Sequence, residues 1–446
     1  MSIDAILTQV HTSAVRLVRF LYCDTSSIIR GKTTHVDRLK DRLESGIGLV
    51  KGMMAMNMLD QMQTDTGLGA TGEVRLVPDP STFVILPYGA GQAMVLCDLV
   101  ELNHSPWAMC PRTILKRQIS KALEAGIKIQ AAFEPEFTVG KLEEDVFKPI
   151  DESLCFSTEG MNRGSDFIEK FVRALEQQNV PVEQYYPELG HGQHELSVSH
   201  APALAAADRL IVYRETLRGV ATDNGLIASL APKPFAEQAG NGCHLHISAW
   251  DKEEKHNLFW SAEGLTEIAK QFIAGILKHL PALVAITCPS VNSYRRLKPR
   301  SWSSAFTCWG YENREAAVRV PSVYWGQEEN STNIEIKCVD SSCNPYLALA
   351  AVIAAGLDGI KRNLKAPPPV DVDPSSFNTD EMAKRGVKRL PASLKEALRA
   401  LLHDGVMMEA LGDPYAAAYI TVKTSEVLAF TKQSLEFELK EHRTKF

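Results

Sequence analysis

The sequence has no C-x-x-C pair, although nine cysteines are spread over its 446 residues. The scattered spacing argues against a disulfide framework, and the lack of a C-x-x-C pair argues against a zinc finger. Cysteines of this kind are typical of a reducing compartment, where they pack in the core of the protein. We therefore expect a cytoplasmic protein with reduced thiols.

Long apolar runs are missing as well. No uninterrupted apolar stretch approaches the roughly 18 residues that indicate a transmembrane helix. The N-terminal segment contains Asp4, lacks a basic leader and shows no cleavage site of small residues, so it does not resemble a signal peptide. We expect no membrane partner, and we predict that this segment forms the first helix and strand of the fold.

The chain also lacks an excess of positive charge and the common phosphate-binding loops. Its net charge of −6 argues against a nucleic acid as the main partner. Neither G-x-x-x-x-G-K-[ST] nor G-x-G-x-x-G after a strand occurs. These absences argue against a P-loop or a Rossmann nucleotide site.

What the chain does contain is enough sequence for two domains. Up to residue 105, short strands bounded by proline and glycine surround a short helix, which predicts a small α+β domain of residues 1–105. A helix beginning at Pro111 opens a second domain of residues 106–446, in which strands and helices alternate. Within it we predict strands at 127–139, 183–199, 243–250 and 333–339.

The strand predicted at 243–250 alternates strictly between apolar and polar side chains. Its polar positions are His244, His246 and Ser248, which leave one face of the strand together. Gly240 and Gly242 precede it, and glycine lets backbone approach a ligand closely. Taken alone, the pattern also fits an amphipathic strand whose polar face is solvated.

The other predicted strands add carboxylates. Glu134 and Glu136 are two residues apart, so both leave one face, where like charges repel unless a cation lies between them. A surface strand edge is the alternative for this pair. Together the strands offer five carboxylates and one imidazole, more than one zinc ion needs and suited to two Mg²⁺ or Mn²⁺ ions. The candidate metal ligands are Glu134, Glu136, Glu188, Glu195, His244 and Glu335.

Three arginines lie between the last two of these strands: Arg296, Arg314 and Arg319. A guanidinium group grips carboxylate or phosphate through two hydrogen bonds at once, which lysine cannot do. Beside two metal ions, such groups would stabilise the charge on a transferring phosphoryl group. For any one arginine alone, a solvated surface charge is the alternative.

Six motifs occur in order along the chain: E-P-E-F, E-x-G-x-G-Q-x-E, G-x-G-x-H-x-H-x-S, N-S-Y-x-R-L, N-R-x-A-x-x-R and N-P-Y-L-A-L-A-A. In this order and spacing they resemble the glutamine synthetase superfamily over nearly the whole chain. The resemblance implies an α+β fold with an N-terminal β-grasp-like domain and a catalytic domain built on a curved antiparallel sheet. It also implies a homo-oligomer, often a ring-based dodecamer, with active sites between neighbouring subunits.

The resemblance also implies roles for individual residues. One metal ion would be held by Glu136, Glu188 and Glu195, and the second by Glu134, His244 and Glu335. Glutamate would contact Gly240, Arg296 and Arg314, and also Lys337, where ammonia-using enzymes have arginine. ATP would contact Glu183, His246, Ser248, Arg314 and Arg319. The groups acting on the phosphoryl oxygens would be Arg296, Arg314 and Arg319.

The implied reaction uses ATP to phosphorylate the γ-carboxylate of glutamate. An amine or ammonia then attacks the resulting acyl phosphate, and phosphate leaves. Ammonia-using relatives carry two carboxylates for the ammonium ion, one in a D-G-S-S motif and one on a flap. Here the segment from Lys51 to Ala55 stands in place of D-G-S-S, and Trp302 stands in place of the flap glutamate. Both anionic partners for ammonium are therefore missing.

The missing carboxylates favour a larger nucleophile than ammonia. Trp302 and Trp309 would suit an alkyl- or arylammonium ion through packing and cation–π attraction, although both could equally be core residues. The sequence thus predicts a glutamate–amine ligase for a primary amine such as methylamine, ethanolamine, a polyamine or an aromatic amine. The alternatives are a glutamine synthetase that recruits its carboxylate elsewhere and a non-catalytic regulatory member of the family. A two-metal hydrolase would leave the three arginines without a phosphate to bind.

Overall fold

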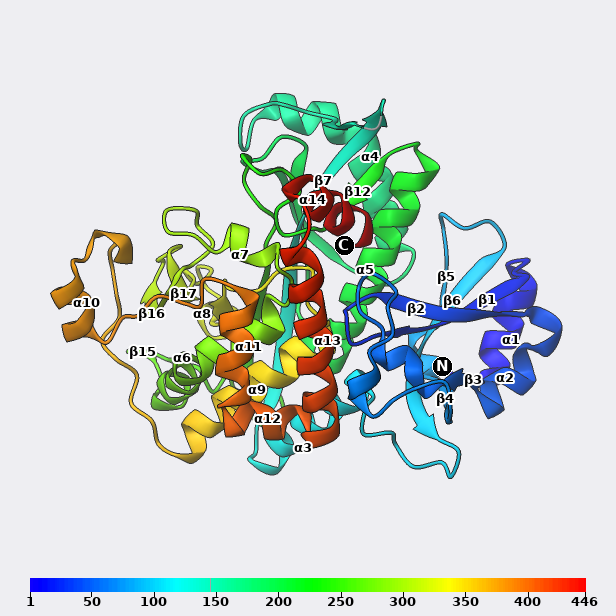
Figure 1. Cartoon of the computed structure of the whole chain (residues 1–446), viewed down its shortest axis with the longest axis horizontal. Coiled ribbons are helices and arrows are strands. Elements are labelled where there is room, and N and C mark those ends of the chain that lie inside the picture. The colour runs from blue at the N-terminus through cyan, green and yellow to red at the C-terminus, as the bar shows by residue number, and fades with distance from the viewer. Residues whose placement is uncertain (145) are drawn as a thin grey trace.

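The N-terminal part of the chain forms a sheet of its own. The computed structural model describes residues 1–144 and 146–446, and the predicted first helix and strand are present in it. The sheet order is β2-β1-β6-β4-β3 with β5 beside β6; β1 and β6 run parallel, and the other pairs are antiparallel. Its elements, at the right of Figure 1, are α1 (Ile3–Thr12), β1 (Leu17–Cys23), β2 (Ile29–His35), α2 (Leu39–Ser45), β3 (Ile47–Val50), β4 (Glu73–Pro78), β5 (Val84–Ile85) and β6 (Gln92–Glu101).

A larger sheet carries the strands with the predicted site residues. Its order is β16-β17-β18-β13-β7-β10-β9, and the short strands β8, β11 and β12 also pair with β7. The pairs are antiparallel except β16 with β17, which run parallel. Its strands are β7 (Lys128–Glu143), β8 (Val146–Pro149), β9 (Val182–Pro187), β10 (Gln193–Val198), β11 (Ala201–Pro202), β12 (Ile227–Ser229), β13 (Cys243–Trp250), β16 (Phe306–Tyr311), β17 (Ala316–Val320) and β18 (Ile334–Ile336).

Helices complete the larger part of the molecule, and β14 (Trp260–Ser261) and β15 (Gly264–Leu265) form a separate hairpin. In Figure 1, α13 lies at the front between the two sheets, while α10 stands out at the far left. The predicted class, α+β with a small N-terminal domain and a catalytic domain on a large sheet, is confirmed. The helices are α3 (Pro111–Glu124), α4 (Thr158–Glu176), α5 (Ala203–Asp223), α6 (Glu267–Thr287), α7 (Ser293–Arg296), α8 (Glu328–Ser331), α9 (Pro345–Lys361), α10 (Thr379–Arg385), α11 (Leu394–Leu402), α12 (Gly405–Leu411), α13 (Asp413–Thr431) and α14 (Leu435–Lys445).

The buried helices α6 and α9 cross at very short range. A Cβ atom on Gly275 would lie 2.1 Å from the carbonyl oxygen of Ala355, and one on Gly359 would lie 2.0 Å from that of Gln271. Among the described helices, α6 alone is long and apolar enough to cross a membrane by length and composition. Two thirds of that apolar window (67%) is buried inside the protein, so α6 serves as a core helix. A search for uninterrupted apolar runs misses it because Lys278 interrupts the run.

Buried ion pairs connect the two sheets. Arg112 at the start of α3 donates hydrogen bonds to Asp208 on α5 at 2.9 and 3.0 Å, and to Asp79 and Asp98 beside the first sheet at 2.7 and 3.1 Å. Because Arg112 is 2% exposed, removing one partner would leave charge buried without compensation. The division into residues 1–105 and 106–446 stays a prediction; the described strands of the first sheet end at Glu101, and α3 begins at Pro111.

The secondary structure departs from the sequence prediction in two places. The stretch 183–199 forms two strands, β9 and β10, joined by a turn in which Gly192 has a φ of +64°, a value that favours glycine. The strands β16 and β17 and the helices α12 to α14 were not predicted. Of these helices, α12 has only seven residues and α13 has apolar residues on all sides, so the 3.6-residue periodicity is weak in both.

His279 on α6 provides a test of the helical core. Its ring nitrogens lie 2.7 Å from Asp404 Oδ2 and 3.0 Å from Asp358 Oδ2. Burial disfavours the charged ring, but the two carboxylates outweigh burial and raise the pKa of His279. The stabilisation is therefore complete below the unfolded-state pKa of about 6.5 and is lost as the pH rises through the higher folded-state value.

We predict that His279→Gln lowers the free energy of unfolding by roughly 1–3 kcal/mol at about pH 6, because two half-buried carboxylates lose their partner. The loss should shrink at pH values above the folded-state pKa. Thermal unfolding at a series of pH values measures both effects. His403→Gln, at an exposed histidine, serves as the control. A loss that does not change with pH would contradict the charged-histidine explanation.

Candidate functional site

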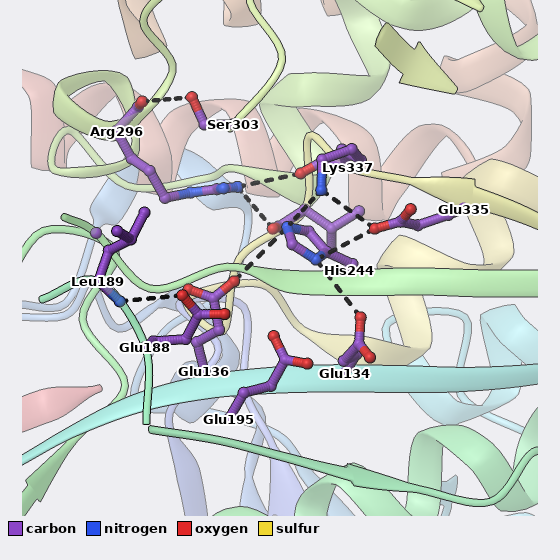
Figure 2. A network of polar contacts seen from close by, with 12 residues as sticks. Glu134, Glu136, Glu188, Leu189, Glu195, His244, Arg296, Ser303, Glu335 and Lys337 are labelled. Carbon is purple, nitrogen blue, oxygen red and sulfur yellow. Dashed lines mark hydrogen bonds and ion pairs between the residues drawn. The ribbon is translucent and has the colours of Figure 1, made fainter. Parts of the chain in front are cut away.

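Strand register brings the predicted ligands together at the middle of the larger sheet. Glu134 on β7 lies opposite His244 on β13, and Glu136 on β7 lies opposite Glu195 on β10. On the far side of β13, β18 adds Glu335. In Figure 2 these side chains converge on one side of the sheet. The two-residue spacing seen in the sequence thus places every one of them on a single face.

His244 stands at the centre of this group. Its Nδ1 atom lies 3.3 Å from Glu335 Oε1 and 3.7 Å from Glu134 Oε2, and its Nε2 atom lies 3.8 Å from Glu136 Oε1. Burial and the neighbouring ammonium group of Lys337 lower the pKa of His244 to about 4. The ring is therefore neutral near pH 7, which is the form that coordinates a metal ion.

Glu134 is shared by both histidines of β13. Its Oε2 atom lies 3.3 Å from His246 Nε2, and the other ring nitrogen of His246 lies 2.9 Å from Asn333 Oδ1. Although burial favours the neutral acid, the nearby rings of His244 and His246 hold the pKa of Glu134 well below its usual range. Burial opposes the charge on His246, but Glu134 outweighs it and raises the pKa of His246 to about 9.

The remaining carboxylates on the β10 side of the cluster repel one another. Burial, followed by the charges of neighbouring glutamates, raises the pKa of Glu195 well above its usual value and that of Glu188 to about 7. The pKa of Glu136 is raised as well, mainly by burial. Tyr186 donates its hydroxyl hydrogen to Glu195 Oε1. Such a cluster gains stability when a cation neutralises it.

Two basic side chains hold Glu335 in its charged form. Arg319 on β17 donates to Glu335 Oε2 at 2.8 Å, and Lys337 lies 3.2 Å from Glu335 Oε1. Burial opposes this charge, but the nearby cations outweigh it and hold the pKa of Glu335 far below its usual range. The Lys337 ammonium also lies 3.5 Å from His244 Nε2. Lys337, predicted to contact glutamate, therefore sits among the predicted metal ligands.

The glycines before β13 permit close approach, as the sequence predicts. A Cβ atom on Gly242 would lie 2.8 Å from Glu136 Oε1, and one on Gly240 would lie 2.3 Å from the carbonyl oxygen of Pro232. The carbonyl oxygen of Gly240 accepts a hydrogen bond from Gln193 at 2.9 Å. Gln193 also donates to Glu136 Oε2 at 2.7 Å. Its side-chain amide therefore orients Glu136, a predicted metal ligand, through a hydrogen bond.

The three predicted arginines lie around the cluster. Arg296, at the end of α7, is 4% exposed and donates to the carbonyl oxygens of Val339 at 2.7 Å and Lys337 at 3.3 Å. Its Nε atom has no partner among the described residues, and the same holds for Nε of Arg319. Arg314 lies in the turn before β17, where it lowers the pKa of Glu188 against the effect of burial. Donors are thus available for an anionic substrate.

The residues predicted to contact ATP differ in how exposed they are and in which side chains they contact. His246 is part of the carboxylate cluster, as described. Ser248 follows on the same face of β13, and its Oγ accepts a hydrogen bond from the indole of Trp250 at 3.0 Å. Glu183 lies exposed near the start of the edge strand β9.

The two predicted amine-pocket tryptophans are separated by the fold. Trp309 on β16 is 3% exposed and donates its indole N–H to the carbonyl oxygen of Pro367 at 2.7 Å, so it packs in the core. Trp302 is 51% exposed and lies in a loop where Arg300, Trp302 and Ser304 all have positive φ values. Non-glycine residues hold such values at a cost, and loops of this kind are common at functional sites.

Glu315 lies beside the Trp302 loop and was not among the predicted site residues. It is 7% exposed, its Oε1 atom accepts the backbone N–H of Trp302 at 2.8 Å, and its Oε2 atom has no partner among the described residues. Burial raises its pKa. The only signal in the sequence was an acidic residue inside the N-R-x-A motif, at a position that the motif leaves open.

The donor set fits divalent metal ions. Single ligand atoms of Glu134, His246 and Glu335 lie within 4.8 Å of one another, and so do those of Glu134, Glu195 and His244. Carboxylate oxygens dominate both groups, as Mg²⁺ and Mn²⁺ prefer. Glu136 and Glu188 adjoin them in Figure 2. The predicted assignment of individual glutamates to one metal or the other stays a prediction.

Comparisons with known proteins identify the class to which this fold and site belong. Residues 2–107 match the glutamine synthetase N-terminal domain, and residues 108–442 match the glutamine synthetase catalytic domain. The chain therefore belongs to the glutamine synthetase family. It is an ATP-dependent ligase that forms carbon–nitrogen bonds, as the sequence predicted.

Individual relatives include ligases with different named products. The chain is 38% identical to the gamma-glutamylpolyamine synthetase GlnA3 of Streptomyces coelicolor, covering 91% of this chain and 88% of the relative. It is 35% identical to the glutamine synthetase of Halobacterium salinarum, over 84% of both chains. Among solved structures, a "GmaS/ADP complex" superposes with a TM-score of 0.84 at 28% identity, over 97% of this chain and 98% of that one.

Gln193 offers a test of the metal site that leaves all the predicted ligands in place. We predict that Gln193→Ala weakens Mn²⁺ binding by about 10–100-fold, because Glu136 loses the amide that orients it. Calorimetric titration with Mn²⁺ measures the affinity, and the melting temperature reports on the fold. Gln327→Ala, at an exposed glutamine, is the matched control. Unchanged Mn²⁺ affinity in a folded Gln193→Ala protein would contradict the assignment.

Proposed function

We propose that this protein joins glutamate to a primary amine in an ATP-dependent reaction and forms a γ-glutamyl amide. The observation that carries the proposal is a complete carboxylate and arginine site without the two carboxylates that ammonia-using relatives offer to ammonium. The whole predicted ligand set is present, which argues against a non-catalytic regulatory protein. The Nε atoms of Arg296 and Arg319, which have no hydrogen-bond partner among the described residues, argue against a metal-dependent hydrolase.

In this proposal, the arginines act on the transferring phosphoryl group and on the carboxylates of glutamate. Arg296, Arg314 and Arg319 stabilise negative charge on the phosphoryl oxygens, and Gly240 offers backbone close to the bound glutamate. Two divalent ions, when bound by the six ligands, would neutralise the phosphates of ATP. His246, Ser248 and Glu183 contact the nucleotide.

The second step consumes an acyl phosphate. The nitrogen of the neutral amine attacks the γ-carbonyl carbon, a C–N bond forms, and the bond from that carbon to the phosphate oxygen breaks. Phosphate leaves with the electron pair, and the two protons lost by the original ammonium group pass to solvent. Arg314 and Arg319 hold the phosphate end, and the amine nitrogen adds to one face of the planar carbonyl group.

The surroundings of the missing carboxylates support an amine larger than ammonia. Lys51, in the segment that replaces D-G-S-S, pairs with Glu101 at 2.8 Å and lies 5.6 Å from the ring centroid of Trp107. The rest of that segment is largely apolar and buried. On the flap, Trp302 is exposed where relatives carry a glutamate. One relative, the gamma-glutamylpolyamine synthetase GlnA3, is named for a product other than glutamine, which is consistent with this proposal.

We further propose that the chain assembles as a homo-oligomeric ring, with twelve subunits as the expected form and active sites between neighbours. A cytoplasmic location accords with the nine cysteines, none of which is paired in a disulfide. Light scattering of the purified protein tests the assembly directly.

The central experiment supplies the protein with ATP, Mg²⁺ and glutamate and compares ammonium with a panel of primary amines. Phosphate release gives the rate, and mass spectrometry identifies the product. We expect a γ-glutamyl amide of at least one amine to form with a kcat/KM at least about tenfold above that for ammonium. Equal or faster turnover of ammonium would contradict the amine proposal, and product formed without ATP would contradict the ligase itself.

One observation favours a second candidate, a glutamine synthetase that uses ammonia. Glu315 is a buried carboxylate beside the flap with a free oxygen, so it is positioned to replace the missing flap glutamate as the partner of ammonium. In that case Glu315→Gln should lower kcat/KM for ammonium by about 100-fold or more, on the scale of removing one charged group at a reacting centre.

The control for this variant is Glu312→Gln, because Glu312 lies on the same turn and is exposed. Metal affinity measured alongside reports whether the site has stayed intact. If the wild-type protein uses ammonium and Glu315→Gln retains that activity, Glu315 is not the substitute carboxylate.

A further inference from the structure

A cavity of about 550 Å³ opens beside the carboxylate cluster. It lies between the start of α4, the edge strand β9 and the turn that carries Arg314. Its walls are three aromatic rings, one thioether, one amide and one guanidinium group, from Phe156, Met161, Gln184, Tyr185, Tyr186 and Arg314. Neither Trp302 nor Trp309 lines it, so the aromatic surface beside the site differs from the one that the sequence predicted.

The aromatic corner of this cavity is anchored to the sheet. The rings of Phe156 and Tyr186 meet edge to face, with centroids 4.9 Å apart and an interplanar angle of 82°. The backbone N–H of Phe156 donates to the carbonyl oxygen of Pro187 at 3.0 Å. Phe156 has a φ of +58°, an unusual value for a bulky residue, which turns its side chain over β9.

The cavity is continuous with the site through two of its own residues. Tyr186 places its ring on the cavity and its hydroxyl group on Glu195, a member of the carboxylate cluster. Arg314 also lines the cavity and is close enough to Glu188 to stabilise its charge. A ligand in the cavity can therefore direct a cationic head toward the glutamates while its body stays among the rings.

The residues that line the cavity favour one kind of substituent on the amine. Among the described lining residues there is no carboxylate, and the single charged group, Arg314, is positive. A second ammonium group on the ligand would thus meet a like charge and no counter-ion. Methylamine or ammonia would leave most of the cavity to water, whereas an aromatic ring would pack against Phe156, Tyr185 and Tyr186.

We propose that this cavity binds the hydrocarbon body of an aromatic monoamine, which is the amine nucleophile of the ligase. The proposal rests on the proposed function and narrows it: an amine with an aryl or arylalkyl group is preferred to methylamine and to a diamine. Phe156 and Met161 are then residues that determine specificity, and they belong neither to the metal cluster nor to the arginine set.

The test uses the full-length protein with ATP, Mg²⁺ and glutamate, and it compares 2-phenylethylamine, methylamine, 1,4-diaminobutane and ammonium. For the wild-type protein, kcat/KM for 2-phenylethylamine should exceed that for methylamine and for the diamine by about tenfold or more. Phe156→Ala removes one ring of the corner, and Met161→Trp fills the cavity. Each should lower the ratio of kcat/KM for 2-phenylethylamine to that for methylamine by about tenfold.

Leu154→Ala is the matched control, because Leu154 is 81% exposed in the same loop and does not line the cavity; it should leave the ratio unchanged. Turnover of methylamine by each variant shows that it has folded. A wild-type preference for methylamine or the diamine, or a ratio that neither variant changes, would overturn the proposal for the cavity while leaving the ligase in place. Absence of turnover with every amine would overturn the proposed function as well.

Discussion

The site depends on the repulsion of buried carboxylates that strand register forces together. β7 lies at the centre of the larger sheet and carries Glu134 and Glu136 on one face, while β10 and β13 bring Glu195 and His244 opposite them. A shift of one residue in β7 would turn both glutamates away from this face. The position of the cluster is thus a property of the sheet rather than of any loop.

The protein offsets part of this repulsion with its own cations. On the β18 side, Arg319 and Lys337 keep Glu335 charged, and His246 helps to keep Glu134 charged. On the β10 side, burial, followed by the charges of neighbouring glutamates, raises the pKa values of Glu188 and Glu195. A cation bound on this side would stabilise the ionised forms of both carboxylates.

Much of this site could be predicted from the sequence because most of its residues lie on strands. Side chains on a strand alternate between the two faces with a period of two residues, and this alternation is visible in the sequence. The alternation from Cys243 to Trp250 matches β13 at both ends, and the same spacing located Glu134 and Glu136. Local patterns could not predict that Trp302 lies in an exposed loop while Trp309 lies in the core, because this difference depends on tertiary packing. The cavity was likewise out of reach, because only the folded chain brings Phe156 next to Arg314.

The position of the cavity at the edge of the sheet has a consequence for how such proteins diversify. Five of the six predicted metal ligands, Glu134, Glu136, Glu195, His244 and Glu335, lie on the inner strands β7, β10, β13 and β18. β9 has a sheet neighbour on only one side, and the loop before α4 is partly exposed. If the cavity binds the amine as proposed, substitutions along this rim can exchange one nucleophile for another at little cost to the phosphoryl chemistry. Recruitment of a new nitrogen source is therefore a shorter evolutionary step than invention of a new reaction.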